Sequence, residues 1–172
     1  MMRTLALAGL LAGVLIGSFF LTLWLIDTGP SWNMSDDRRD AERLASRNIF
    51  DRSDLIEAAV AVGLHSSSSM KGMVETVSRL NDREVTIKGW VADRDGDATP
   101  LSVLVFVGGR TAASVQTRGE RSDVTNLHSL AFGAEKNVGF EATFACPTGD
   151  HAVVVGLGQD KQYFYLSSPD CP

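Results

Sequence analysis

The longest apolar stretch of the chain comes at its start. From Thr4 to Ile26 it contains no charged residue and no Pro, Asn or Gln. A helix of this length reaches roughly 35 Å at ~1.5 Å per residue, which is enough to cross a hydrocarbon core of ~30 Å with some tilt. Arg3 is the one charged side chain before the stretch and Asp27 follows it, an asymmetry that favours a cytoplasmic N-terminus. The pattern predicts a single transmembrane helix with the rest of the chain exported.

Two other interpretations of this stretch fit less well. A cleaved signal peptide has an apolar region of ~7–15 residues and small residues at its cleavage site. This stretch is longer, and its end from Leu23 to Asp27 has no small residues. A buried helix of a soluble protein is rarely so long and uncharged. We therefore expect a signal-anchor, with the C-terminal part on the far side of the membrane.

The predicted anchor carries Gly9, Gly13 and Gly17, spaced four residues apart. In a helix these glycines share one stripe, where a second backbone can approach closely. Glycine is also common in membrane helices without such a contact. We expect the stripe to pack against another membrane helix, either from a second copy of the chain or from a different membrane protein.

Residues 27–69 read as a juxtamembrane linker with one or two short helices. Trp32 is placed for the membrane interface, and 35–48 has the composition of a polar helix, either a spacer or a surface that docks on a partner. A second helix is expected over 54–62, although that run also suits a strand. His65–Ser69 is serine-rich and reads as a flexible joint before the next domain.

From residue 70 to residue 172 the pattern changes to short apolar runs separated by turns. The run from Glu84 to Ala92 alternates clearly, and Gly89 interrupts the alternation in the way that a β-bulge does. The pattern predicts an antiparallel β-sandwich of about seven strands, so the chain as a whole is mainly β. The expected strands are 74–79, 84–92, 101–107, 111–116, 139–145, 152–157 and 162–166.

Charge and cysteine content narrow the partners and the compartment. All 21 acidic residues and all but one of the 16 basic residues follow Ile26, so the exported part is mildly acidic. It has no basic run, which argues against nucleic acid as a partner. Cys146 and Cys171 are the two cysteines. The last three strands are expected to form a meander, which places both cysteines at the same edge, and a disulfide there would contribute about 3 kcal/mol. Two free, buried thiols are the alternative.

Several short motifs occur in a fixed order within the predicted sandwich. Gly89-Trp90-x-x-Asp93 is followed by a V-x-V-x-x-G strand, then by Arg121-x-Asp123-Val124, Gly139-Phe140 and the strand 149–155. This order resembles a bacterial immunoglobulin-like β-sandwich module that is often appended to glycosyltransferases and cell-envelope proteins. The resemblance covers Met73 to Tyr165 and implies an Ig-like fold. Together with the predicted anchor it implies a bacterial inner-membrane protein with the C-terminal part periplasmic or extracellular. It implies no transferase activity, because no glycosyltransferase domain accompanies it.

We expect these motif residues to be structural. Trp90 is expected to fill the space between the two sheets, and Phe140 to add core area. Arg121 and Asp123 flank a turn and are expected to tie a loop down by hydrogen bonds, with Asp93 as a further partner.

A calcium loop is the first candidate for chemistry. Asp93, Asp95 and Asp97 have the alternate spacing of calcium ligands, but Ala98 and Leu104 stand where such a loop needs Gly and Glu. The stretch lies between two strands, so ordinary turn residues are the better interpretation.

The other candidates are weaker. The histidines, His65, His128 and His151, have no metal-ligand spacing. A thiol pair of Cys146 with His151 requires a free cysteine, against the expected disulfide.

No catalytic pattern remains. The carboxylates of Asp123 and Glu141 have no determined separation, and no nucleophile elbow, P-loop or dinucleotide fingerprint is present. We expect no catalytic residue, no cofactor and no metal.

A non-catalytic binding or scaffolding role follows as the leading hypothesis. The expected partners are a membrane protein, through the anchor, and an envelope protein or glycan, through a sandwich edge or the long polar stretch Thr117–Ala131. One alternative is an accessory subunit of a larger inner-membrane complex, such as envelope-polysaccharide machinery. An enzyme acting on envelope glycans is the second.

Overall fold

The computed structural model describes residues 34–94, 100–127 and 137–172. Within these ranges no helix is both long and apolar enough to cross a membrane. The predicted anchor, with Gly9, Gly13 and Gly17, lies outside them. One compact unit, Ser35–Pro172, contains both sheets.

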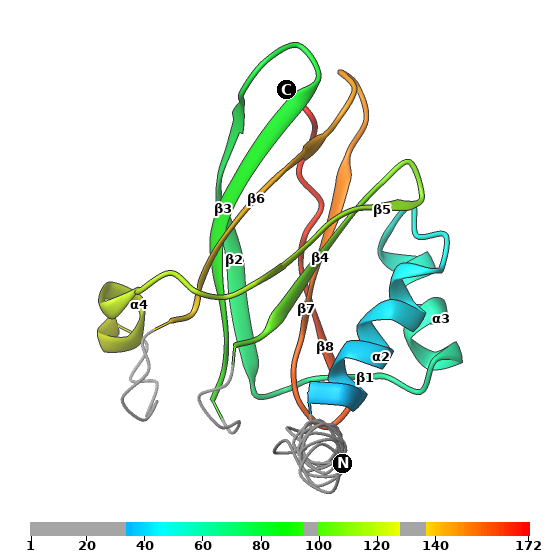
Figure 1. The fold of residues 1–172 in the computed structure, drawn as a ribbon, viewed down its shortest axis with the longest axis vertical. Helices are drawn as coiled ribbons and strands as arrows, with labels where there is room; N and C mark the ends of the chain where they lie inside the picture. Colours follow the sequence, from blue (N-terminus) through cyan, green and yellow to red (C-terminus); the bar gives the residue numbers. More distant parts are fainter. Residues whose placement is uncertain (1–33, 95–99, 128–136) are drawn as a thin grey trace, which may run out of the picture. The chain divides into compact units, whose positions relative to one another are not determined.

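The described chain is mainly β, with two sheets and short helices (Figure 1). Each of the seven expected strands is present to within a few residues, and the prediction of a mainly β, two-sheet fold is confirmed. The run at 54–62, which suits either a helix or a strand, is a helix. The elements are α2 (Met34–Ala45), α3 (Arg52–Ala61), β1 (His65–Ser66), β2 (Met70–Arg79), β3 (Glu84–Asp93), β4 (Ser102–Val107), β5 (Arg110–Gln116), α4 (Ser122–Leu127), β6 (Gly139–Ala145), β7 (Ala152–Leu157) and β8 (Gln162–Ser167).

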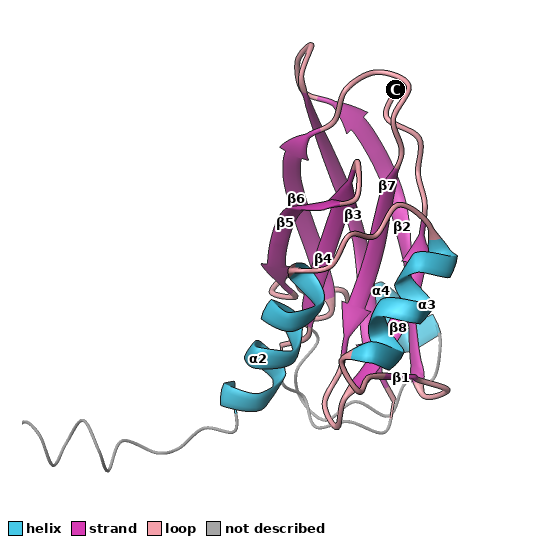
Figure 2. Ribbon diagram, turned by 90° about the vertical axis from the view of Figure 1, so that its right-hand side faces the viewer, coloured by secondary structure: helices cyan, strands magenta, loops and turns pink. Residues whose placement is uncertain are grey.

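The strands form two layers (Figure 2). The five-stranded sheet has the order β1-β8-β7-β4-β5, and the three-stranded sheet has the order β2-β3-β6. Neighbouring strands are antiparallel except β1 and β8, which are parallel. The main core lies between the layers, where alternate residues of β3 such as Val85 and Ile87 meet alternate residues of β4 and β7 such as Val105 and Val154.

The irregularity expected at Gly89 is present, but the extra residue is on the partner strand. The register of β2 against β3 shifts between Val74 and Thr76, which leaves Glu75 as the additional residue of a bulge. A Cβ at Gly89 would collide with the Met73 carbonyl oxygen, so only glycine lets the two backbones approach this closely.

The helices α2 and α3 pack on the outer face of the five-stranded sheet and do not stand off as a spacer. Leu44 and Leu55 share a second hydrophobic cluster with Phe106 of β4 and Val153 of β7. Asp51 caps α3, since its carboxylate accepts from the backbone N–H groups of the first turn. The sequence pattern favours a spacer at 35–48, because few of its residues are apolar. Those few are sufficient to dock the helix, because the sheet supplies the rest of the hydrophobic cluster.

The expected meander of the last three strands is wrong, although the disulfide forms. β6 pairs with β3 in the three-stranded sheet, whereas β7 and β8 pair in the five-stranded sheet. Cys146 follows β6 and Cys171 lies beyond β8, with 5.8 Å between their Cα atoms. The disulfide therefore links the two layers.

Candidate functional site

Four of the motif residues meet on the outer face of the three-stranded sheet, near the C-terminal end of β3: Trp90, Arg121, Asp123 and Gly139. Residues alternate along β3, so Val91 points into the main core and Trp90 points away from it. Trp90 is 4% exposed and packs with Val124 of α4 and with Val138. The prediction that Trp90 fills the space between the two sheets is therefore wrong, since Trp90 lies beneath α4. The other face of β3 already holds Val85 and Ile87.

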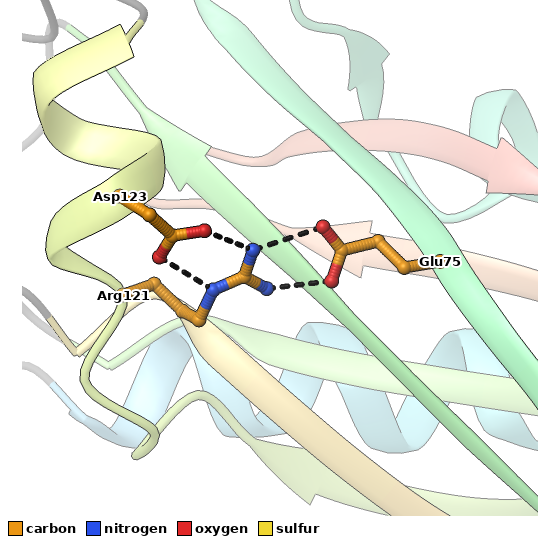
Figure 3. A network of polar contacts seen from close by, with 3 residues as sticks. All are labelled: Glu75, Arg121 and Asp123. Atoms are coloured by element: carbon orange, nitrogen blue, oxygen red, sulfur yellow. Dashed lines mark hydrogen bonds and ion pairs between the residues drawn. The ribbon is translucent and has the colours of Figure 1, made fainter.

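Arg121, just before α4, binds two carboxylates at once (Figure 3). Its Nε and Nη2 donate to Asp123 at 2.9 and 2.7 Å, and its Nη1 and Nη2 donate to Glu75 at 2.6 and 2.9 Å. Both pairs have the planar two-point geometry that guanidinium and carboxylate groups share. The loop that carries α4 is thereby attached to the bulge of β2.

The electrostatics of this cluster follow from the two-point contacts. The hydrogen bonds from Arg121 lower the pKa of Asp123 to about 2, and those to Asp123 and Glu75 raise the pKa of Arg121. Asp123 remains largely exposed. The guanidinium is permanently charged at any physiological pH, so the Asp123 carboxylate stays ionised beside it.

Gly139 makes room for the Arg121 side chain. Gly119 and Gly139 exchange backbone hydrogen bonds of 3.0 and 2.9 Å, which attach the segment after β5 to the start of β6. A Cβ at Gly139 would lie 3.0 Å from Arg121 Cγ and 3.0 Å from the Gly119 carbonyl oxygen. The glycine therefore lets the stem of Arg121 cross the sheet at close range on its way to Glu75.

Phe140 and Gly89 are direct partners across β3 and β6. Phe140 points into the main core, as the sequence predicts, and a Cβ at Gly89 would lie 2.9 Å from its Cζ. The Gly-Trp and Gly-Phe motifs thus meet on neighbouring strands, with the tryptophan on one face of the sheet and the phenylalanine on the other.

Asp93 belongs to a second polar cluster, at the C-terminal end of β3, three residues beyond Trp90. It is buried and accepts a hydrogen bond of 2.6 Å from Ser69 Oγ. Ser67 is hydrogen-bonded to Ser69 at 3.1 Å between the hydroxyl oxygens, and it donates to Gln162 of β8. The segment that the sequence predicts to be a flexible joint thus has buried serines that link β2, β3 and β8.

The sequence motifs do not include four residues that take part in these two clusters: Glu75, Ser67, Ser69 and Gln162. Glu75 is one of many charged residues on a strand, and only the bulge at that position identifies it. The serines belong to a run of four identical residues, and their pattern does not separate the buried members from the exposed ones. A buried hydroxyl needs a partner that the sequence cannot supply by itself.

The remaining candidates occupy separate places. Cys146 is in the disulfide, so it cannot act as a thiolate with His151. His151 Nε2 lies 2.7 Å from the Phe50 carbonyl oxygen. Glu141 pairs with Lys88 at 3.1 Å, whereas Asp123 pairs with Arg121.

The metal hypothesis has no support in the described ranges, which contain no group of three or more His, Cys, Asp or Glu residues that could hold a metal ion. Asp95, Asp97 and His128 lie outside the described residues.

Comparison with protein-family models finds no match, and neither the curated proteins nor the solved structures contain a significant match to this chain.

Proposed function

We propose that the chain is a membrane-anchored, non-catalytic scaffold or binding protein with an Ig-like sandwich on the periplasmic side of a bacterial inner membrane. The uncharged stretch from Thr4 to Ile26 supports the anchor. The disulfide between Cys146 and Cys171 supports an oxidising compartment for the sandwich. The two assignments agree, because a cytoplasmic N-terminus sends the sandwich to the far side of the membrane.

One observation carries the non-catalytic role. The most polar residue of the motifs, Arg121, directs its guanidinium to Glu75 and Asp123, two carboxylates of its own domain. Trp90 is likewise covered, by Val124. The groups that a catalytic or ligand-binding interpretation would use are therefore engaged in holding α4 on the sheet.

The Ig-like assignment is supported by the way in which the motifs meet. The Gly-Trp strand pairs with the Gly-Phe strand, and the segment Arg121–Val124 covers Trp90 on the outer face of the sheet. The three motifs that carry the resemblance thus form one packing unit, which gives a physical reason for their occurrence together.

Binding to another membrane protein is assigned to the anchor. The stripe of Gly9, Gly13 and Gly17 would allow close helix packing, and an accessory subunit of an envelope complex would use the same stripe. A glycan or envelope protein, if one is bound, would contact the sandwich.

The test is affinity purification of the full chain in mild detergent, with mass spectrometry of the proteins that accompany it. The variant replaces Gly9, Gly13 and Gly17 by Leu. A matched control replaces Ala8, Ser18 and Thr22 by Leu, since a helix would place these small residues away from the glycine stripe. A stoichiometric membrane protein should accompany the native chain and the control, but not the glycine variant.

The outcomes separate the hypotheses. Loss of a single membrane protein from the glycine variant supports the accessory-subunit form of the proposal. If all three chains purify alone, the anchor has no partner, and a glycan-binding screen of the full chain tests the sandwich. Turnover of an envelope glycan by the purified chain would overturn the non-catalytic assignment.

A further inference from the structure

β2 forms an outer edge of the three-stranded sheet, because β3 is its one neighbour there among the described strands. Two backbone hydrogen bonds flank the paired part of β2 and β3: Leu80 N donates to Glu84 O, and Arg94 N donates to Ser69 O. Counting from these bonded pairs shows which residues of β2 are hydrogen-bonded to β3. Bonded and non-bonded pairs alternate in an antiparallel ladder. It follows that the N–H and C=O groups of Gly72 and Val74 point away from β3, toward the outer edge.

The side chains beside this edge follow a simple order. Lys71, Met73 and Glu75 alternate along the outer face of the sheet, since their neighbours Gly72 and Val74 face the core side. Met73 is 48% exposed. Lys71 is exposed and has no ion pair with another described residue. Glu75 is held in place by Arg121.

We propose that β2 pairs with β2 of a second copy of this chain, antiparallel and about a two-fold axis at Met73. In that register Gly72 of one copy bonds to Val74 of the other, and these are the residues whose backbone groups face outward. Lys71 then lies directly opposite the Glu75 of the other copy, twice, and the two Met73 side chains meet at the axis. The backbone register and the charge complementarity select the same alignment.

The surroundings of the edge favour a closed dimer. The bulge at Glu75 interrupts the regular ladder directly after the paired segment, which prevents pairing from continuing along the strand. A two-fold axis uses each edge once, so no open fibre results. Arg121 orders the Glu75 carboxylate in advance, which lowers the entropic cost of pairing it with a lysine. The result is a continuous six-stranded sheet made from two three-stranded sheets.

The predicted interface is small, because five residues of strand bury less than the ~1,200 Å² of a stable complex. The inference does not rest on the proposed function. If the chains do share a membrane, their anchors raise the effective concentration of the edges and favour pairing.

Cysteine cross-linking of the purified full chain tests the register. In the proposed dimer Met73 faces its own copy as a non-bonded pair with ~4.5 Å between Cα atoms, within the range of a disulfide. Ser78 is on the same strand and the same face but would be roughly 33 Å from its copy. Under mild oxidation Met73→Cys should give about tenfold more covalent dimer than Ser78→Cys, with the same anchor in both.

A charge variant provides the second test. Lys71→Glu in the Met73→Cys background places two carboxylates opposite each other at both ends of the pair, and it should lower the cross-linked fraction about fivefold. Lys71→Arg, which keeps the charge, should leave it unchanged. Equal cross-linking at positions 73 and 78, or none at 73, would overturn the proposal, because the β2 edges of two copies would then not pair at Met73. Insensitivity to the sign of the charge at position 71 would reject this register.

Discussion

Arg121 and Glu75 are 46 residues apart in the chain, yet they link the segment that leads into α4 to β2, with 2.6 Å between Nη1 and Oε2. The link depends on the β2 bulge, which leaves Glu75 as an additional residue of the strand. It also depends on Gly139, over which the stem of Arg121 crosses the sheet. A local irregularity in one strand thus determines how the loop after β5 is held.

Removing the charge of Glu75 should weaken the fold measurably. Glu75→Gln is expected to lower the free energy of unfolding by about 1 kcal/mol, since a two-point ion pair is lost but both groups are partly exposed and screened. Urea denaturation of the full chain in detergent, followed by tryptophan fluorescence, measures the change. The matched control is Lys88→Gln, which breaks an exposed ion pair on the same sheet and should cost less than about 0.5 kcal/mol. Equal effects of the two substitutions would contradict a special role for Arg121.

Asp123 should make stability depend on pH in the acidic range. The pKa of Asp123 is lowered to about 2 in the folded chain, whereas an unfolded aspartate titrates near ~3.9. A lowered folded pKa gives a contribution that is complete above the unfolded pKa and lost as the pH falls through the folded one. The stability difference between the native chain and Asp123→Asn should therefore be constant above about pH 5 and vanish near pH 2.

Thermal denaturation of both chains across that pH range measures this difference. A difference that persists unchanged at pH 2 would show that Asp123 acts by packing and not by its charge. Because Asp123 is 67% exposed, the difference should also shrink in high salt.

A methyl group at position 139 should be costly. Gly139→Ala is expected to destabilise the chain by about 1–3 kcal/mol, because its Cβ would press on both Arg121 Cγ and the Gly119 carbonyl oxygen. Gly119→Ala is the matched control on the other side of the same backbone bridge. Its Cβ would meet nothing nearer than 3.4 Å, so the change should be within about 1 kcal/mol of the native chain. A reversed order of the two variants in urea denaturation would refute this account of the glycine.

The docking of α2 should be visible in stability. Leu44 is fully buried against the five-stranded sheet, so Leu44→Ala is expected to cost about 3 kcal/mol. Val60, on the exposed side of α3, is the control; it is 69% exposed, and Val60→Ala should change stability by less than about 0.5 kcal/mol. A Leu44→Ala chain as stable as the native one would restore the interpretation of 35–48 as a spacer.

The seven longer strands are predictable because their signal is local. Gly139–Ala145 and Ala152–Leu157 have the bounds that alternation and flanking turns predict. The two-residue strand β1 is too short to produce such a pattern. The strands β4 and β7 are apolar at nearly every position, whereas a strand with one face in solvent would alternate apolar and polar residues. Their alternate residues face the main core and the helices, so both faces of the sheet are buried.

The candidate site is less predictable, because it is made of residues from different elements. The motifs identify Trp90, Arg121 and Gly139, but the partner Glu75 depends on a register shift that no local pattern encodes. The face on which Trp90 lies could be predicted by counting along β3 from Ile87. The expectation that the largest side chain fills the main core conflicts with that count, and the alternation prevails.

The sequence by itself determined where the seven longer strands lie, which two cysteines can pair, and where an uncharged stretch long enough for a membrane lies. These properties depend on the order of neighbouring residues, through the period of a strand or the length of a helix. Only the tertiary structure decided that β6 joins β3 instead of β7, that α2 packs on the sheet, and that Arg121 meets Glu75. Those outcomes depend on contacts between distant segments, and such contacts are selected by the packing of the whole core.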